Sequence, residues 1–173
     1  MGKSLALDSV REAELERMMN AYGGMLTGLC SALVKDSHLA QDIVQETFVK
    51  AWRKMDSLRG GRQSEKAWLC RIALNLCRDC QRTRWLRLVE PKAEIDQPAP
   101  WYTIENDSAA DVMEALGALK PKYREVLTLH YLQNMNAEEI GQIVNLSPSA
   151  VYRRLSKAKS QFRRLLEGWE NDG

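Results

Sequence analysis

The sequence lacks any apolar run that approaches the roughly 20 residues needed to cross a bilayer. Charged residues such as Lys3, Asp8 and Arg11 interrupt its N-terminal region, so we expect neither a secretory leader nor stable membrane insertion. Alternation of apolar and polar residues is absent over any convincing length, which excludes a large β-sheet. No internal repeat is present, which excludes a solenoid. These absences favour an all-α protein of the cytoplasm.

Histidine and cysteine are scarce, with two and four residues respectively. Cys77 and Cys80 have the two-residue spacing of some zinc sites, and Cys70 precedes them by two helical turns. The two histidines, His38 and His130, fall in other predicted elements. We therefore expect no metal site and no cofactor, and we interpret the thiols as small buried side chains.

The net charge is only +2, but the basic residues are concentrated in two places. Segment 66–87 has six basic residues against one acid, and segment 140–166 has six against none. Two separate positive faces of this kind are typical of proteins that contact nucleic acid. Asp42 and Glu46 lie one helical turn apart, but no nucleophile or phosphate-binding loop accompanies them, so we expect no enzymatic activity.

Apolar residues at three- and four-residue steps predict three helices in the first half of the chain. The first stripe covers 15–33 and includes Met19, and the second covers 39–55 after Asp36 and Ser37, either of which can cap a helix. A glycine pair, Gly60 and Gly61, predicts a turn before the third stripe at 69–80. Three amphipathic helices favour a small bundle.

Between 89 and 110 the composition changes, with three prolines and five acids against one lysine. This composition predicts a linker, which we expect to hold the flanking modules apart. Whether the two modules pack together in the free chain stays open at this point. Beyond it, apolar periodicity over 112–119, 123–130 and 140–144 predicts further short helices. The predicted fold is all-α, with two small helical bundles (1–88 and 111–173) joined by a flexible linker (89–110).

The stretch 137–166 has the turn chemistry of a helix-turn-helix. Asn145 tolerates the left-handed backbone that ends a helix, Ser147 can cap the next one, and Pro148 suits its first position. The apolar stripe of the second helix then leaves polar residues outside, and the first of these are candidates for base-edge contact: Ser149, Tyr152, Arg153 and Lys157. Further cations are candidates for phosphate contact: Arg154, Lys159, Arg163 and Arg164.

With both halves described, the chain resembles the extracytoplasmic-function sigma factors of bacterial RNA polymerase, within the sigma-70 family. Segment 36–55 (DSHLAQDIVQETFVKAWRKM) is similar to the family's polymerase-clamp segment, and 67–82 (AWLCRIALNLCRDCQR) to its minus-ten helix. The second half resembles the minus-thirty-five module. Several positions depart from the pattern. Glu65 stands where an aromatic residue is common, Cys80 where tyrosine is common, Gly141 where alanine is common and Asn145 where glycine is common. Residues 157–159 read Lys-Ala-Lys where Arg-Ala-Arg is usual.

The resemblance implies a non-catalytic subunit that binds core RNA polymerase and directs promoter-specific initiation under anti-sigma control. It implies promoter DNA as a partner, both as duplex and as a melted strand. The implied polymerase-binding residues are Asp42, Gln45, Glu46, Val49 and Arg53. The implied minus-ten residues are Arg59, Arg62, Trp68, Arg71, Asn75, Arg78, Asp79 and Arg82. The implied minus-thirty-five residues are Ser149, Tyr152, Arg153, Arg154, Lys157, Lys159 and Arg163.

Two other classes of function remain open at this point. A helix-turn-helix regulator would use its N-terminal bundle as a sensor or partner-binding domain, although the arginine-rich stretch 68–87 is unexpected in a sensor. An anti-sigma factor or adaptor would act without DNA, and the two basic faces argue against it.

Overall fold

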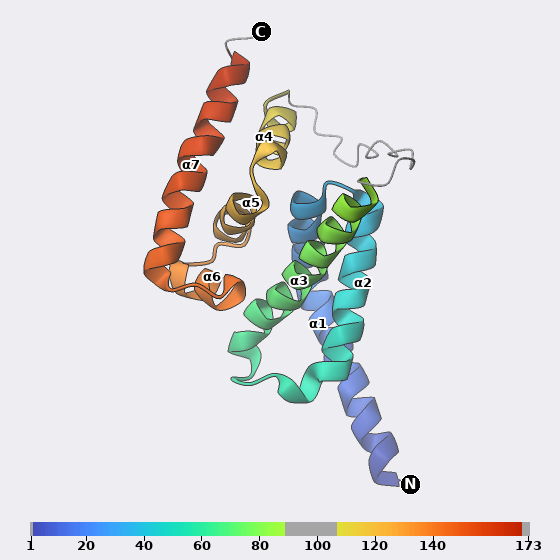
Figure 1. The fold of residues 1–173 in the computed structure, drawn as a ribbon. Coiled ribbons are helices and arrows are strands. Elements are labelled where there is room, and N and C mark those ends of the chain that lie inside the picture. Colours follow the sequence, from blue (N-terminus) through green and yellow to red (C-terminus); the bar gives the residue numbers. More distant parts are fainter. Residues whose placement is uncertain (1, 89–106, 171–173) are drawn as a thin grey trace.

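The computed structural model describes the backbone of residues 2–88 and 107–170 and the side chains of 5–84 and 110–168. All the regular structure within these residues is helical. The helices form two groups that lie side by side, as Figure 1 shows. The prediction of an all-α fold is therefore confirmed. The predicted linker lies largely outside the described residues, and its last positions belong to the helix that begins at Asp107.

The first bundle consists of three long helices. They are α1 (Gly2–Val34), α2 (Ser37–Lys54) and α3 (Arg62–Leu88), with a 3-10 turn (Met55–Ser57) after α2. Lys35 has a positive φ of 56°, which turns the chain, and the Asp36 carboxylate accepts a hydrogen bond from the Leu39 amide at 3.0 Å. Asp36 is thus the residue that caps α2.

Burial along these helices follows the predicted stripes, with one exception. Leu29, Phe48 and Leu69 come from α1, α2 and α3 and meet in the core. Met19, which the stripe of α1 included, is 48% exposed. That part of the prediction is wrong, because Met18 already fills the inward position at this level of α1 and is 1% exposed.

Within residues 107–170, the second bundle contains three short helices and one long one. They are α4 (Asp107–Ala118), α5 (Pro121–Leu127), α6 (Ala137–Val144) and α7 (Pro148–Glu170). A π-helical turn (Thr128–Leu132) extends α5 and leaves Tyr131 and Leu132 more than half exposed. Inside, Val126 and Leu129 pack against Ile140 from α6 and the buried stripe of α7.

The turn between α6 and α7 has the predicted chemistry at each position. Asn145 adopts the left-handed conformation (φ 59°, ψ 53°), and the Ser147 hydroxyl accepts a hydrogen bond from the Ala150 amide at 3.3 Å. Helix α7 begins at Pro148. A methyl group at Gly141 would overlap the Leu146 carbonyl oxygen, so glycine at this position permits the close approach of the turn.

The two bundles pack directly against each other, because α5 and α6 lie beside α1 and α3 (Figure 1). Arg124 donates to the Leu33 carbonyl of α1 at 3.0 Å, and Lys66 of α3 donates to the Gln133 carbonyl at 2.6 Å. The sequence left open whether the two modules pack together in the free chain, and in this structure they do. Hydrogen bonds from side-chain donors of one bundle to main-chain carbonyls of the other stabilise this contact. The composition of the linker gives no information about them.

Candidate nucleic-acid and protein interfaces

The N-terminal half of α7 presents a polar and basic face to solvent. Tyr152 is 65% exposed, and Ser149, Arg153 and Lys157 are exposed beside it. The opposite side of the helix is buried through Val151 and its apolar neighbours one and two turns on, so rotation of α7 about its axis is fixed. The predicted base-contacting residues are thus brought together on one outer surface.

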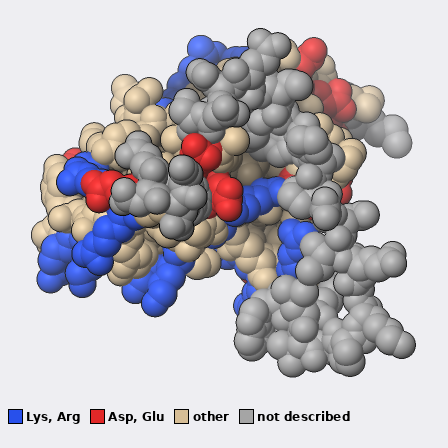
Figure 2. All heavy atoms as spheres, turned by 90° about the horizontal axis from the view of Figure 1, so that it is seen from above, with Lys and Arg blue, Asp and Glu red and all other residues tan. Residues whose placement is uncertain are grey.

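A hollow of about 230 Å³ lies next to this face. Its cations come from two helices, because Lys122 of α5 joins the arginines and the lysine of α7. The lining residues are Lys122, Tyr123, Ala150, Arg153, Arg154 and Lys157. In Figure 2, lysine and arginine side chains project along the side of the molecule where α7 lies. A concave surface with several cations suits a phosphate group.

Sequence reasoning missed Lys122. Its ammonium group lies 5.0 Å from the centroid of the Tyr123 ring, which orients it at the edge of the hollow. The available signal was weak: Pro121 predicts the start of a helix, so Lys122 stands in a first turn. Only the packing of α5 against α7 places that turn beside Arg153 and Arg154.

Two of the predicted phosphate-contacting residues lie elsewhere. Lys159 and Arg163 border an apolar groove of about 430 Å³ between α4, the π-helical turn and α7. The Lys159 ammonium lies 5.5 Å from the centroid of the Tyr131 ring. The groove is lined mainly by Val112, Met113, Leu116, Leu132, Phe162 and Leu166. The structure therefore separates Lys159 and Arg163 from the hollow that holds Arg153.

The predicted minus-ten residues, on α3 and in the loop before it, fall into two groups. Arg59 and Arg62, Asn75, and the Asp79–Arg82 ion pair (3.3 Å) are exposed, and Trp68 is half-buried. Arg71, which is also exposed, and the partly buried Arg78 form hydrogen bonds with the second bundle. Arg71 donates to the Gln142 carbonyl, and Arg78 forms two hydrogen bonds with the Glu125 carboxylate, at 2.9 and 2.7 Å.

The pair between Arg78 and Glu125 is unevenly buried. The Glu125 side chain is 6% exposed, whereas that of Arg78 is 39% exposed. The carboxylate raises the pKa of Arg78 through these hydrogen bonds. Burial lowers the pKa of Arg124. Its guanidinium donates hydrogen bonds to three carbonyls at the end of α4, which have no partner within the helix.

The outward face of α2 carries the predicted polymerase-binding residues. Asp42, Gln45, Val49 and Arg53 are exposed, and Glu46 is partly exposed. Ile43 and Phe48 face the core from the same helix. The mixed charge and the 41% exposure of Val49 suit a surface that another protein covers.

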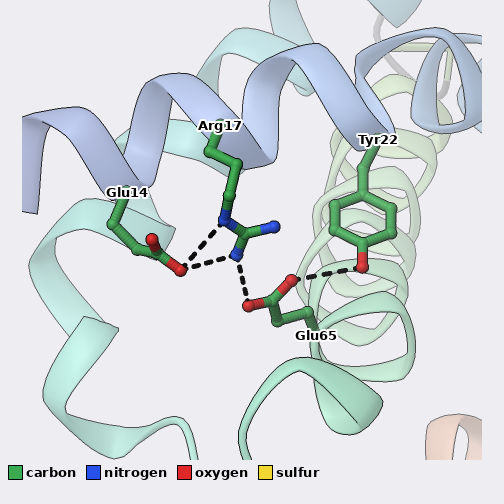
Figure 3. Close-up of polar contacts among 4 residues, drawn as sticks. All are labelled: Glu14, Arg17, Tyr22 and Glu65. Atoms are coloured by element: carbon green, nitrogen blue, oxygen red, sulfur yellow. Dashed lines mark hydrogen bonds and ion pairs between the residues drawn. The ribbon is translucent and has the colours of Figure 1, made fainter.

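A polar cluster links α1 to the first turn of α3, as Figure 3 shows. The Glu65 side chain is 2% exposed, and its Oε1 accepts a hydrogen bond from Arg17 Nη2 at 2.5 Å. Its Oε2 accepts one from the Tyr22 hydroxyl at 3.1 Å. Arg17 also donates to Glu14, and this hydrogen bond is the main reason that the pKa of Glu14 is lowered. Burial, followed by the hydrogen bond to Glu65, raises the pKa of Tyr22.

The cysteines are thiols within the packing of the first bundle. Cys30, Cys70 and Cys77 are buried, and Cys80 is partly exposed. Burial raises the pKa of Cys70 to about 12, and a hydrogen bond with Cys30 is the largest cause of the raised pKa of Cys77. Across 2–88 and 107–170, no group of three or more His, Cys, Asp or Glu side chains is placed to hold a metal ion.

Comparison with known proteins gives the family. Residues 18–87 match Sigma-70 region 2, and residues 109–162 match Sigma-70, region 4. The RNA polymerase sigma factor CnrH of Cupriavidus metallidurans is 33% identical over 139 residues, which cover 73% of this chain and 72% of CnrH. The chain belongs to the sigma-70 family of RNA polymerase sigma factors.

Further relatives of this sigma factor place it in the extracytoplasmic-function group. The ECF sigma factor SigM of Bacillus subtilis is 29% identical over 150 residues, covering 82% of this chain and 88% of SigM. A probable sigma factor of Xanthomonas campestris, RfaY, is 30% identical over 161 residues. The match covers 87% of this chain but only 40% of RfaY, so the chain spans less than half the length of that relative.

Solved structures agree with the fold of this sigma factor. The sigma factor RpoE of Bartonella quintana, in complex with the anti-sigma factor NepR, superposes with a TM-score of 0.73 at 24% identity. That match covers 89% of this chain and 97% of RpoE. CnrH in complex with the cytosolic domain of CnrY superposes with a TM-score of 0.68 at 28% identity, covering 91% of this chain and 90% of CnrH.

Membership of the sigma-70 family excludes the two other classes, a helix-turn-helix regulator with a sensor domain and an anti-sigma factor or adaptor. The N-terminal bundle contains a sigma region and is not a separate sensor domain, and the helix-turn-helix is the DNA-binding part of region 4. Sigma factors are non-enzymatic transcription initiation factors. Among the helices described, none combines the length and apolar character needed to cross a membrane.

Proposed function

We propose that this sigma factor binds core RNA polymerase through the outward face of α2 and positions the enzyme on two promoter elements. The minus-thirty-five element meets the N-terminal half of α7. The minus-ten element meets α3 and the loop 58–61 that precedes it. The enzyme supplies the chemistry, and this chain supplies the geometry.

The observation that carries the proposal is the rigid presentation of α7. The capped turn from Asn145 to Pro148 and the buried inward stripe of α7 fix which side chains reach outward. Tyr152 and Arg153 can reach base edges, whereas Arg154 and Lys122 lie where they can neutralise phosphates. Such an arrangement gives both register and affinity on duplex DNA.

The contacts between the bundles set a condition on this function. While the bundles are docked, Arg78 is engaged by the Glu125 carboxylate and Arg71 donates to the Gln142 carbonyl, so both guanidinium groups are already partly engaged. We therefore infer that the second bundle moves away from α3 when the promoter is engaged. The exposed residues Arg59, Arg62 and Asn75 need no such movement.

We further propose that an anti-sigma factor controls this chain in the cytoplasm, where promoter DNA is found. Support comes from the similar fold of RpoE, which was solved with an anti-sigma factor. The apolar groove beside α7 supports it as well, because cations at its edge, Lys159 and Arg163, suit an amphipathic helix with acidic flanks. Leu132→Glu in this groove should weaken such a complex and leave promoter binding unchanged.

The decisive experiment is reconstituted transcription. Purified chain and core polymerase are incubated with genomic DNA fragments, and the 5′ ends of the transcripts are mapped. We expect starts that depend on the chain and share two sequence elements upstream. Glu46→Lys on α2 should abolish the starts by loss of polymerase binding, whereas Tyr152→Ala should retain polymerase binding and lose promoter choice. Starts that do not change when the chain is left out would overturn the proposal.

A further inference from the structure

The loop before α3 is folded onto the first turn of that helix. Gly60 and Gly61 have positive φ angles of 88° and 63°, which only glycine adopts readily. The Ser64 amide donates to the Gly61 carbonyl at 3.1 Å, and a methyl group at Gly60 would overlap the Ser64 hydroxyl oxygen. The shape of the loop is therefore determined by where the first turn of α3 lies.

Glu65 determines where that turn lies. Each of its carboxylate oxygens has a separate partner on α1, so the side chain cannot rotate without loss of a hydrogen bond. An aromatic or aliphatic side chain at this position would bury similar surface but would impose no direction. The hydrogen bonds from Arg17 and Tyr22 tie the first turn of α3 to α1, as Figure 3 shows.

The fixed turn presents two cations. Arg59 and Arg62 flank the glycine pair and are exposed. Arg62 is also close enough to Glu14 for its charge to contribute to the lowered pKa of that carboxyl group. The loop, its two arginines and the buried bridge therefore form one continuous structure at the start of α3.

We propose that Glu65 is a positioning residue for promoter opening. Through Arg17 and Tyr22 it holds loop 58–61 so that Arg59 and Arg62 meet the phosphates of the melted strand. The proposal rests on the proposed function and adds a residue that touches no DNA itself. It predicts that loss of the bridge impairs strand opening and leaves polymerase binding and upstream duplex binding intact.

The first test uses the full chain alone. Hydrogen exchange is compared between the wild type and the variants Glu65→Gln and Tyr22→Phe. In Glu65→Gln, amide exchange over 60–64 should be about ten-fold faster, with no change over the buried part of α2. Tyr22→Phe removes one hydrogen bond and should give a smaller increase at the same amides. Unchanged exchange over 60–64 in both variants would overturn the proposal.

The second test measures opening on a mapped promoter by permanganate reactivity of thymines. At a temperature well below unfolding, Glu65→Gln should open about ten-fold less promoter while its affinity for core polymerase stays within about two-fold. The control is Leu29→Ala, a core change on α1 away from the loop, which lowers stability without altering the bridge. Equal losses of opening in the two variants would assign Glu65 a general structural role and overturn the proposal.

The two proposals fail in different ways. A wild-type chain that binds no core polymerase contradicts the sigma activity itself. A wild-type chain that opens promoters together with an equally active Glu65→Gln variant contradicts only the positioning role. Rescue of opening by Glu65→Asp with Arg17 intact would support the need for a carboxylate at this position.

Discussion

Arg78 of α3 and Glu125 of α5 form a bidentate ion pair across the two bundles, with nitrogen–oxygen distances of 2.9 and 2.7 Å. The pair uses a residue that the sequence assigned to the minus-ten element. Under the proposed function, this guanidinium must leave Glu125 before it can contact the minus-ten element.

Glu125→Gln should loosen the docked bundles. Because Arg78 is 39% exposed, we expect a loss of only about 1–2 kcal/mol of docking free energy. Small-angle X-ray scattering of the free chain should show a larger radius of gyration. Fluorescence anisotropy should show several-fold tighter binding of a single-stranded minus-ten oligonucleotide, because Arg78 is released.

Arg78→Ala is the matched variant for that prediction. It breaks the same ion pair, so the scattering curve should expand in the same way. Its oligonucleotide affinity should not rise, because the cation itself is gone. An equal gain of affinity in both variants would show that Arg78 does not contact DNA.

Lys122→Ala tests the hollow beside α7. We expect weaker binding to duplex DNA of any sequence, and a slope of log K against log salt that is smaller by about 1. Titrations at several salt concentrations measure this slope. Lys54→Ala, a change of an exposed cation at the end of α2, should leave the slope unchanged. A slope that does not respond to Lys122→Ala would remove this residue from the DNA surface.

Asn145 tests the turn of the helix-turn-helix. Asn145→Ala should lower the free energy of unfolding by about 1–2 kcal/mol, because alanine resists the left-handed backbone at φ 59°. Asn145→Gly should be close to neutral, since glycine adopts this conformation freely. Thermal denaturation compares the two variants. Equal stability of the alanine and glycine variants would contradict this account of the turn.

Cys70 gives a prediction about alkaline pH. Its pKa is raised from 9.0 to about 12 by burial, so the folded chain keeps the thiol protonated while the unfolded chain releases the proton. The resulting stability is fully present below pH 9 and is lost as the pH rises toward 12, at about 1.4 kcal/mol per pH unit. The free energies of unfolding of the wild type and Cys70→Ala, measured by urea denaturation, should therefore converge as the pH rises from 8 to 11. A difference between the two free energies of unfolding that stays constant with pH would contradict this prediction.

The sequence predicted the features that depend on neighbouring residues. The turn at Asn145, Ser147 and Pro148 and the cap at Asp36 could be assigned because each residue acts within four positions of its partner. The outward faces of α2 and α7 followed from helical periodicity for the same reason.

Features that join distant segments could not be predicted in this way. Glu65 is buried because Arg17 and Tyr22 arrive from α1, more than forty positions earlier. Its departure from the aromatic pattern marked the position as unusual, but it did not identify the partners. Lys122 and the Arg78–Glu125 pair likewise depend on how whole helices pack.

Lys66, Arg71 and Arg124 each cross between the bundles to a main-chain oxygen. A peptide oxygen is present whichever amino acid occupies the acceptor position. Replacement of the side chain at Gln133, Gln142 or Leu33 therefore leaves these acceptors in place, whereas loss of any one donor removes its contact. These three contacts therefore depend on the donor side chains alone, whereas the Arg78–Glu125 pair depends on both of its side chains.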